Sequence, residues 1–526
     1  MKLTDEQIAA VDLFKASSSL KIAAFAGTGK TTTLTALGGS TNKSGIYLAF
    51  NKSIAVEAQK KFPQSVHSRT THSLALRFIA NKYNGNQAKL FSSLQGNHVA
   101  QMLEIQEISI VDVLLKPRAL GYLTAKTIQK FCQSGDDLIS RQHVPLSGKL
   151  KRLRPDHRLE FESYLAALAS HLWDRMQDPG DSAPLGHDGY LKLWSLSSPT
   201  LQYDFILLDE AQDTNEAVLS VLRKQRAQLT LVGDRHQQIY AWRGAVNAMA
   251  NFDTAAESSL TQSFRFGPEI AELATHILRG LDETNTLRGN PQLKGSIATT
   301  GWAQTVLCRT NAGVISVVLE SLESQEKPHV IGGVADLICM LEDVSRLKRK
   351  VPAESSDLFG FRDWDEVVEF ATTEEGESLN SFVNIVTANG EGVLIGALRT
   401  VETSEGSADL VVSTGHKAKG REWPEVRLHN DFAPIKLRKE NGKTLLTDTE
   451  ATRLLYVATT RPQGKLIVPS GIATALGITM GSSLVAESEV GHSAAQGSSA
   501  AIPARTPMPR PTLPAFAKIA SQSGTR

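Results

Sequence analysis

The chain has 526 residues, of which 41% are hydrophobic and 21% charged, so it can bury more than one core and we expect two to four globular domains. Its 56 Lys and Arg side chains balance 55 Asp and Glu side chains. Net charge therefore neither predicts nor excludes a polyanionic partner, and any nucleic-acid site must be local. The spacing of Cys132, Cys308 and Cys339 excludes a recognisable zinc site or disulfide framework and favours a reducing compartment.

The N-terminal segment MKLTDEQIAA has no apolar signal core, and no later stretch approaches the ~20 apolar residues that span a bilayer. We therefore expect neither export nor membrane insertion. The expected location is cytoplasmic, or associated with the nucleoid if the protein is bacterial.

The first part of the chain alternates short apolar runs with helix-like segments, which is typical of βαβ units on a parallel sheet. The strand-like runs are Ile22 to Phe25 and Ile46 to Phe50, and the apolar run FILLDE resumes the pattern after residue 200. We predict a first α/β domain from residues 1–80 and 200–255. Residues 81–199 are more helical and polar, and are predicted to be an insertion.

Strand-like runs return at Leu229–Val232, Thr305–Leu307, Leu410–Ser413 and Leu466–Val468. The later ones predict a second α/β domain from residues 256–315 and 398–470, with a small, acidic insertion at 316–397. Residues 482–526 are rich in Ser, Ala, Pro and Gly and are predicted to be disordered. This Pro-rich tail is a candidate binding segment for a protein partner.

A phosphate site is predicted in the run IAAFAGTGKTTTL, between a strand and a helix. Gly27 and Gly29 let the backbone N–H groups face phosphate oxygens, Lys30 can reach the β and γ phosphates, and the Thr31 hydroxyl can bind Mg²⁺. The strict pattern begins with Gly where this chain has Ala24. The predicted nucleotide-binding residues of this loop are Ala26, Gly27, Thr28, Gly29, Lys30, Thr31 and Thr32.

A second candidate element, YDFILLDEAQD, ends an apolar strand on two acids. The carboxyl edge of a parallel sheet is where ligands bind. Asp209 is predicted to hold Mg²⁺ and Glu210 to polarise the attacking water, so the pair indicates hydrolysis rather than binding alone. By itself such a pair is more often a helix cap or a solvated turn; the P-loop upstream weakens that alternative.

The run LVGDRHQQIYAWRGA follows DEAQD, and the chain resembles superfamily 1 helicases of the UvrD/Rep type. The resemblance continues in LTDEQ, AFNKSIAVEA, TTHSLA, TQSFRFGPEI, GHKAKGREWPEV and EATRLLYVATTR. The sequences of these motifs are most similar to those of the F-box DNA helicase branch, although this chain has no evident F-box segment. It implies an α/β fold of two tandem RecA-like P-loop domains with parallel sheets, with ATP and Mg²⁺ as cofactors.

The resemblance also implies roles at the ATP site. Gln7 matches the residue that reads adenine, and Phe264 matches an aromatic that stacks on it, although a phenyl ring there could instead be core. Gly420 and Glu422 belong to a coupling element that also holds Lys419, with Glu422 near the ribose. The predicted γ-phosphate contacts are Gln237, Arg265 and Arg461, and the predicted catalytic set adds Lys30, Asp209 and Glu210 to them.

DNA contacts are implied in the same way. Trp242 matches a base-stacking tryptophan, with a buried aromatic anchor as the alternative. The other residues assigned to DNA are Phe50, Asn51, Thr70, His72, Tyr240, Arg243, Thr414 and His416. The basic run with Lys149, Lys151, Arg152 and Arg154 is either a contact to duplex phosphates or a solvated helix face.

We therefore expect an ATP-dependent 3′ to 5′ single-stranded DNA translocase and helicase that acts on single strands and at junctions with duplex, as a monomer, in repair or recombination. The polarity rests on the resemblance alone. Two alternatives stay open: a translocase that removes bound proteins with little unwinding, as the short second insertion suggests, and a nucleotide-switched binding module. The tail lacks an acidic cluster for a catalytic metal, so no nuclease activity is expected.

Overall fold

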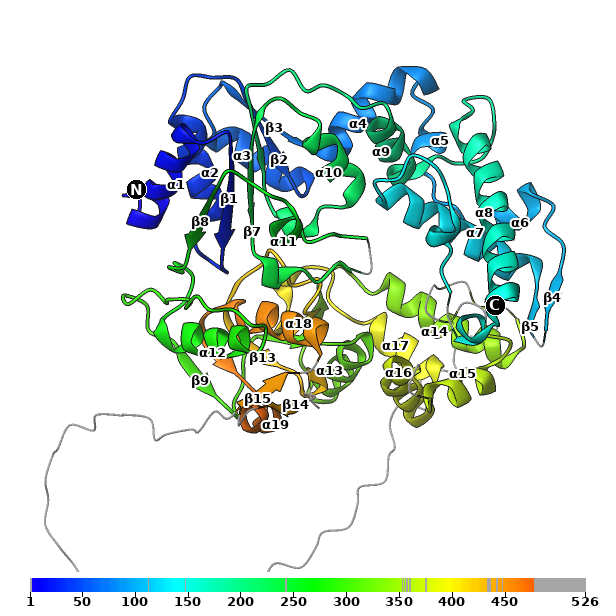
Figure 1. The fold of residues 1–526 in the computed structure, drawn as a ribbon. Helices are drawn as coiled ribbons and strands as arrows, with labels where there is room; N and C mark the ends of the chain where they lie inside the picture. The colour runs from blue at the N-terminus through cyan, green and yellow to red at the C-terminus, as the bar shows by residue number, and fades with distance from the viewer. Residues whose placement is uncertain are drawn as a thin grey trace, which may run out of the picture. The chain divides into compact units, whose positions relative to one another are not determined.

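The first half of the chain is built on a parallel sheet of six strands in this computed structural model (Figure 1). The structure describes residues 2–111, 113–146, 148–241, 244–351, 353, 355, 358, 361–373, 376–432, 437–440, 443–446 and 448–476. In spatial order the strands are β3 (Val66–Thr70), β2 (Gly45–Ala49), β6 (Phe205–Leu208), β7 (Gln228–Gly233), β1 (Ser19–Ala24) and β8 (Ala256–Leu260).

Apolar residues on both faces of these strands explain why the sheet is covered on both sides. In β2, Ile46 and Leu48 belong to one core cluster, and Tyr47 and Ala49 to another. Successive side chains of a strand point to opposite faces, so continuous apolar runs are typical of a parallel sheet buried on both sides. Helices α1 (Asp5–Ala16), α2 (Lys30–Gly39) and α3 (Lys52–Lys61) cover one face, and α4 (Thr71–Ile79), α10 (Glu216–Arg223) and α11 (Ala248–Asn251) share the other core.

The segment between α4 and β6 is mainly helical and packs into the second of these cores. Phe131 meets the Trp173 ring edge-on at 5.4 Å in its interior. A short hairpin interrupts the helices. The elements are η1 (Ala80–Tyr83), α5 (Gln87–Phe91), α6 (Gly96–Met102), β4 (Ile108–Ile110), β5 (Val113–Leu115), α7 (Pro117–Gln133), η2 (Arg141–His143), η3 (Gly148–Arg152), α8 (Pro155–Gln177) and α9 (Gly186–Leu196).

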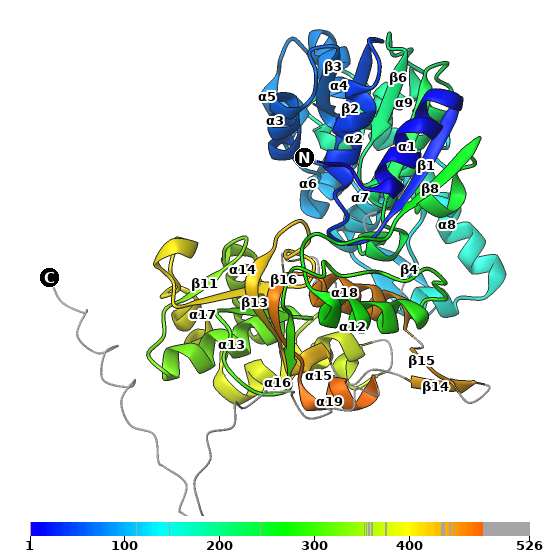
Figure 2. The ribbon, with the colours of Figure 1, turned by 90° about the vertical axis from the view of Figure 1, so that its left-hand side faces the viewer.

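A second six-stranded parallel sheet forms the later half (Figure 2). Its order is β11 (Pro328–Val330), β12 (Leu410–Thr414), β10 (Thr305–Cys308), β13 (Trp423–Leu428), β16 (Pro462–Ile467) and β9 (Ser296–Ala298). Its two faces again contribute to different clusters, because Leu307 packs with one set of helices and Val306 with another. The first set is α12 (Pro268–Arg279), α18 (Thr449–Thr459) and α19 (Ser470–Ala475), and the second begins with α13 (Asn311–Glu323).

Four further helices follow α13 and pack into its cluster. They are α14 (Ala335–Lys348), α15 (Trp364–Ala371), α16 (Glu377–Asn389) and α17 (Glu391–Leu398). Among the described residues no single helix has the length and hydropathy to cross a membrane. The bent pair α16–α17 passes that test only when taken together, across a 96° bend. Leu394 and Leu398 of this pair are fully buried in the protein core.

The predicted strands are confirmed, since each predicted run overlaps β1, β2, β6, β7, β10, β12 or β16 and extends at most two residues past its end. Two strands belong to a different part of the fold than the predicted domain boundaries imply. Strand β8 starts just after the boundary at 255, yet it pairs with β1 in the first sheet; its polar sequence AESSL carries no apolar strand signal. Strand β11 pairs with β12 in the second sheet, although it falls inside the predicted insertion 316–397. The predicted disordered tail, 482–526, lies outside the described residues.

Smaller elements connect the main ones. Short turns of helix lie next to the strands that carry the candidate site, and a hairpin precedes α18. They are η4 (Ala211–Asp213), η5 (Arg235–Gln237), η7 (Glu405–Ser407), η8 (Asn430–Phe432), β14 (Leu437–Glu440) and β15 (Lys443–Leu446).

Candidate nucleotide and DNA site

The loop between β1 and α2 has the backbone shape that its glycines predict. Gly27 and Gly29 have φ of +73° and +76°, which L side chains rarely adopt. A Cβ at Gly27 would also lie 2.5 Å from Ser263 Oγ. Ala24, where the strict pattern has Gly, is the last residue of β1 and does not have positive φ. The departure from the pattern therefore causes no backbone strain.

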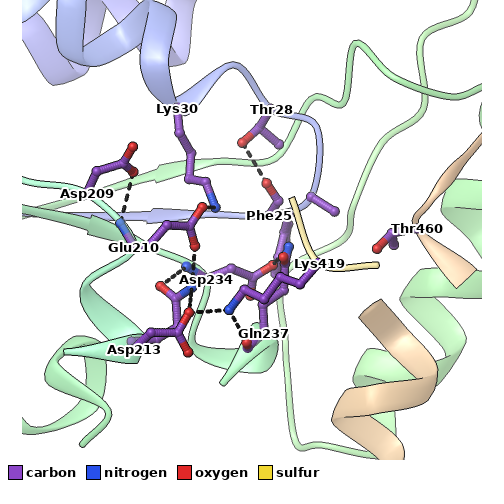
Figure 3. A network of polar contacts seen from close by, with 12 residues as sticks. Phe25, Thr28, Lys30, Asp209, Glu210, Asp213, Asp234, Gln237, Lys419 and Thr460 are labelled. Carbon is purple, nitrogen blue, oxygen red and sulfur yellow. Dashed lines mark hydrogen bonds and ion pairs between the residues drawn. The ribbon is translucent and has the colours of Figure 1, made fainter. Parts of the chain in front are cut away.

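The two acids stand where β6 ends, next to the loop lysine (Figure 3). Lys30 Nζ lies 2.9 Å from Glu210 Oε1. Burial alone would lower the pKa of Lys30, but Glu210 and Asp209 outweigh it, and the pKa is raised above its usual value. Burial would raise the pKa of Glu210, and Lys30 outweighs that effect, so its pKa is lowered. At neutral pH both side chains are charged, and they form an ion pair.

Tyr47 is a residue of this site that sequence reasoning missed. Its side chain points from β2 beside Asp209, and its hydroxyl donates a 2.6 Å hydrogen bond to Asp209 Oδ2. Both side chains are buried. The alternation of β2 could have placed Tyr47 on the α2 face, but nothing in the sequence indicates which acid it meets.

We expect Tyr47→Phe to destabilise the nucleotide-free protein by about 1–3 kcal/mol, because it leaves a buried carboxylate oxygen without its donor. Urea unfolding followed by circular dichroism measures the change. Tyr83→Phe is the matched control: Tyr83 is also buried, but its hydroxyl donates 3.0 Å to a neutral carbonyl, that of Gln177, and its loss should cost less. Equal losses in both variants would contradict a charge-assisted bond at Asp209.

A cavity of about 890 Å³ lies between these residues and side chains from the second half of the chain. It brings together all six residues of the predicted catalytic set. The predicted site residues that line it are Ala26, Gly27, Thr28, Gly29, Lys30, Thr31, Thr32, Phe50, Asn51, Asp209, Glu210, Gln237, Tyr240, Phe264, Arg265, Gly420, Glu422 and Arg461.

The two arginines that line the cavity both bond Thr460, at the end of α18. Arg265 Nε donates to Glu422 Oε2 at 2.6 Å, and its NH1 donates to the Thr460 carbonyl at 3.0 Å. Arg461 is only 2% exposed and lies just past the end of α18. Its guanidinium donates to the Val457 carbonyl of that helix and to the hydroxyl of the cap residue Thr460. Burial and the nearby Arg265 lower the pKa of Arg461 to about 9, so it stays charged at neutral pH.

The two predicted adenine contacts flank the same glycine. A Cβ at Gly29 would lie 3.1 Å from Gln7 Nε2 and 3.5 Å from the Phe264 ring. Phe264 is 38% exposed, which argues against its being a core residue. Gln7 is buried and does not line the cavity; its amide bonds Thr33 and caps α1 with Thr4. Adenine reading by Gln7 remains a prediction.

The described DNA candidates differ in their surroundings. Phe50 and Tyr240 stack at 6.2 Å, and the Tyr240 hydroxyl donates to the His416 carbonyl at 3.0 Å. The Phe50 ring is half exposed and offers a face to a base. Thr70 caps α4, Asn51 caps α3, and Thr414 is buried at the end of β12. These three side chains thus have local structural roles in this state.

His72 meets other partners, His187 and Tyr190 of α9. Trp242 and Arg243 lie outside the described residues, as does the side chain of Lys149. Lys151, Arg152 and Arg154 of the basic run are exposed, so both interpretations of that run stay open.

Lys419 connects the two halves inside the cavity (Figure 3). Its ammonium contacts the Asp213 carboxylate and donates 2.6 Å to the Gln237 carbonyl. It also lies 5.4 Å from the centre of the Tyr240 ring. One cation therefore touches the acidic element, a predicted γ-phosphate contact and a predicted DNA contact. Asp213 was missed as a site residue, although it is the last residue of the motif DEAQD.

The chemistry of the donors around Thr31 and Asp209 fits Mg²⁺, which prefers carboxylate and hydroxyl oxygens. Elsewhere in the described residues, Cys308, His429 and Asp431 lie close enough to share an ion. Both oxygens of Asp431 are already used by the Arg309 and Thr310 N–H groups, the Thr310 hydroxyl and His429. This second group therefore ties the end of β10 to η8 and has no spare carboxylate oxygen.

Comparison with known proteins agrees with this geometry. Residues 3–257 match the UvrD/REP helicase N-terminal domain, and residues 202–470 match the UvrD-like helicase C-terminal domain. The chain belongs to the UvrD-like helicase family. The predicted family and fold class are thereby confirmed.

F-box DNA helicase 1 of Gallus gallus is 30% identical to this chain over 515 residues, which cover 90% of this chain and 49% of the relative. F-box DNA helicase protein 1 of Schizosaccharomyces pombe is 30% identical over 511 residues, 89% of this chain and 57% of the relative. ATP-dependent DNA helicase PcrA of Leuconostoc citreum is 33% identical over 90 residues, 16% of this chain and 12% of the relative. The chain spans about half the length of the two F-box relatives.

Proposed function

We propose that this protein is an ATP-driven DNA helicase that moves 3′ to 5′ along single-stranded DNA. The observation that carries the proposal is the cavity in which Lys30 and Glu210 of the first half face Arg265 and Arg461 of the second. A site for hydrolysis shared between two α/β halves lets nucleotide turnover change how the halves meet. Membership of the UvrD-like family and the DNA helicase names of its relatives support the DNA substrate.

In the proposed mechanism the loop N–H groups and Lys30 hold the phosphates of ATP, and Thr31 and Asp209 hold Mg²⁺, which supplies neutralising charge at the phosphates when bound. Glu210 accepts a hydrogen bond from a water and orients it for attack on the γ phosphate. Gln237, Arg265 and Arg461 stabilise the charge that develops there. For this the Arg461 guanidinium exchanges its bonds to Val457 and Thr460 for the phosphate.

Coupling to DNA is proposed to pass through Lys419 and Tyr240. A phosphate draws Lys419 from Asp213, and Lys419 also contacts Tyr240, whose ring stacks on Phe50. Base stacking on such rings tolerates any sequence and contributes ~1–3 kcal/mol per base. Each ATP cycle thus alters the grip on the strand at one defined place.

The test is strand displacement on matched duplexes with a 3′ or a 5′ single-stranded tail, with ATP and Mg²⁺ and at two salt concentrations. We expect displacement from the 3′ tail only, none with Lys30→Ala, and weaker binding in higher salt. Displacement from the 5′ tail would refute the polarity. Absence of strand-stimulated ATP hydrolysis in the wild type would refute the motor itself.

A translocase that clears proteins from single strands is the second candidate, favoured by the small size of the second insertion, α14 to α17. It predicts strand-stimulated ATP hydrolysis and displacement of streptavidin from a biotinylated strand, with little duplex unwinding. We also propose that the helicase acts as a monomer in the cytoplasm, in DNA repair or recombination.

A further inference from the structure

Tyr456 is a fully buried tyrosine on α18 whose hydroxyl joins the two halves of the chain at the P-loop. The hydroxyl accepts a 3.2 Å hydrogen bond from the backbone N–H of Ala26. It donates a 2.9 Å hydrogen bond to Asp234 Oδ2. One atom of the second half therefore holds both the loop after β1 and the turn after β7.

The bond to Asp234 matters because Asp234 in turn holds Gln237. Asp234 Oδ2 accepts a 2.8 Å hydrogen bond from Gln237 Nε2, while Oδ1 accepts the His236 N–H at 3.0 Å. Gln237 lines the cavity, and the Lys419 ammonium binds its carbonyl. Without the tyrosine hydroxyl, the oxygen that orients the Gln237 amide loses one of its two donors.

Arg461 follows the last turn of α18, directly after the C-cap residue Thr460. Its Nε bonds the Val457 carbonyl at 2.7 Å, and its NH2 bonds the Thr460 hydroxyl, which donates in turn to the Tyr456 carbonyl at 2.9 Å. The contact between the Tyr456 hydroxyl and the loop after β1 therefore also sets the distance between Arg461 and that loop. Burial, followed by the charge of Asp234, raises the pKa of Tyr456 well above its usual value, so the hydroxyl stays a donor at any working pH.

We propose that Tyr456 is a positioning residue for ATP hydrolysis: its hydroxyl orients Gln237 through Asp234 and docks the Arg461 turn on the P-loop, so that both groups reach the γ phosphate together. This inference rests on the proposed ATPase function. From the motif EATRLLYVATTR only Arg461 was predicted as a site residue, because the sequence does not show which groups a buried tyrosine bonds.

The test is Tyr456→Phe, which removes the hydroxyl and keeps the ring. We expect kcat for strand-stimulated ATP hydrolysis to fall about tenfold to 10²-fold, the scale of a small misplacement of catalytic groups, with KM for ATP changed less than about threefold. The matched control is Tyr83→Phe, a buried tyrosine in the first insertion that also donates one hydrogen bond. Its kcat should equal that of the wild type.

A double-variant cycle separates positioning from a general loss of structure. If Tyr456 acts through Gln237, Tyr456→Phe should reduce kcat much less in a Gln237→Ala background than in the wild type. Asp234→Asn weakens the same connection at the residue between Tyr456 and Gln237, and it should show the same fall in kcat with KM retained. This second variant tests the inference if Tyr456→Phe folds poorly.

Wild-type kcat in Tyr456→Phe, a matching rise in KM, or strictly multiplicative effects with Gln237→Ala would each overturn the inference. An inactive wild type would instead refute the proposed function, so the two failures are distinguishable.

Discussion

Lys30→Ala is expected to reduce kcat for ATP hydrolysis by about 10³-fold, the upper scale for loss of one preorganised charge contact at a reacting phosphate. Lys30 Nζ sits 2.9 Å from Glu210 and is kept protonated by Glu210, Asp209 and Asp234. Removing it leaves these acids facing the incoming triphosphate without their counter-charge. Nucleotide affinity should therefore fall as well, by at least tenfold in a fluorescent-nucleotide titration.

The matched control for this variant is Lys224→Ala. Lys224 is exposed at the end of α10, and its ammonium bonds the Ser198 hydroxyl, away from the cavity. It should hydrolyse ATP at the wild-type rate. A folded Lys30→Ala protein, with the wild-type circular dichroism spectrum, that kept kcat within tenfold would show that another group holds the γ phosphate.

Much of this site could be predicted from sequence because its residues lie at the carboxyl ends of strands. The P-loop follows β1 and Asp209 follows β6, so the parallel order of the sheet brings them to one edge whatever the intervening chain does. The turn at Gly27 and Gly29 could also be predicted, because the positive φ of a glycine depends on its own backbone and not on distant contacts. Arg265 and Arg461 were found only by resemblance, because their approach depends on the packing of a second sheet.

What sequence could not supply is the identity of partners between distant elements. Tyr47 meets Asp209 and Tyr456 meets Asp234 across 162 and 222 residues. A buried tyrosine in an apolar run looks the same in sequence whether its hydroxyl bonds a backbone carbonyl or a carboxylate. Strand β8 was not predicted for another reason. It lies at the edge of the sheet, its sequence AESSL is mostly polar, and the apolar pattern that marks β1 and β7 is absent.

Glu210→Gln is the second variant with a large expected effect, and it should separate hydrolysis from binding. The pKa of Glu210 is lowered, because Lys30 and Lys419 outweigh burial, so the side chain is a carboxylate at neutral pH and can accept a hydrogen bond from the attacking water. Glutamine keeps the shape and an oxygen for Lys30 but is no base. We expect kcat to fall by about 10²–10⁴-fold, the usual scale for a lost general base.

Binding of ATP should survive in this variant, since one negative charge near the phosphates is gone while Lys30 remains. The measurement is single-turnover hydrolysis beside nucleotide titration, with Glu257→Gln as control: Glu257 is exposed on β8 and pairs with Lys21, outside the cavity. Glu210 has φ of +50°, a left-handed conformation uncommon for a side chain of its size, and its N–H is held by Asp209 at 2.9 Å. That backbone aims the carboxylate into the cavity and should persist with glutamine. A parallel loss of kcat and affinity would therefore mean that Glu210 serves chiefly to hold Lys30, and the water would need another base.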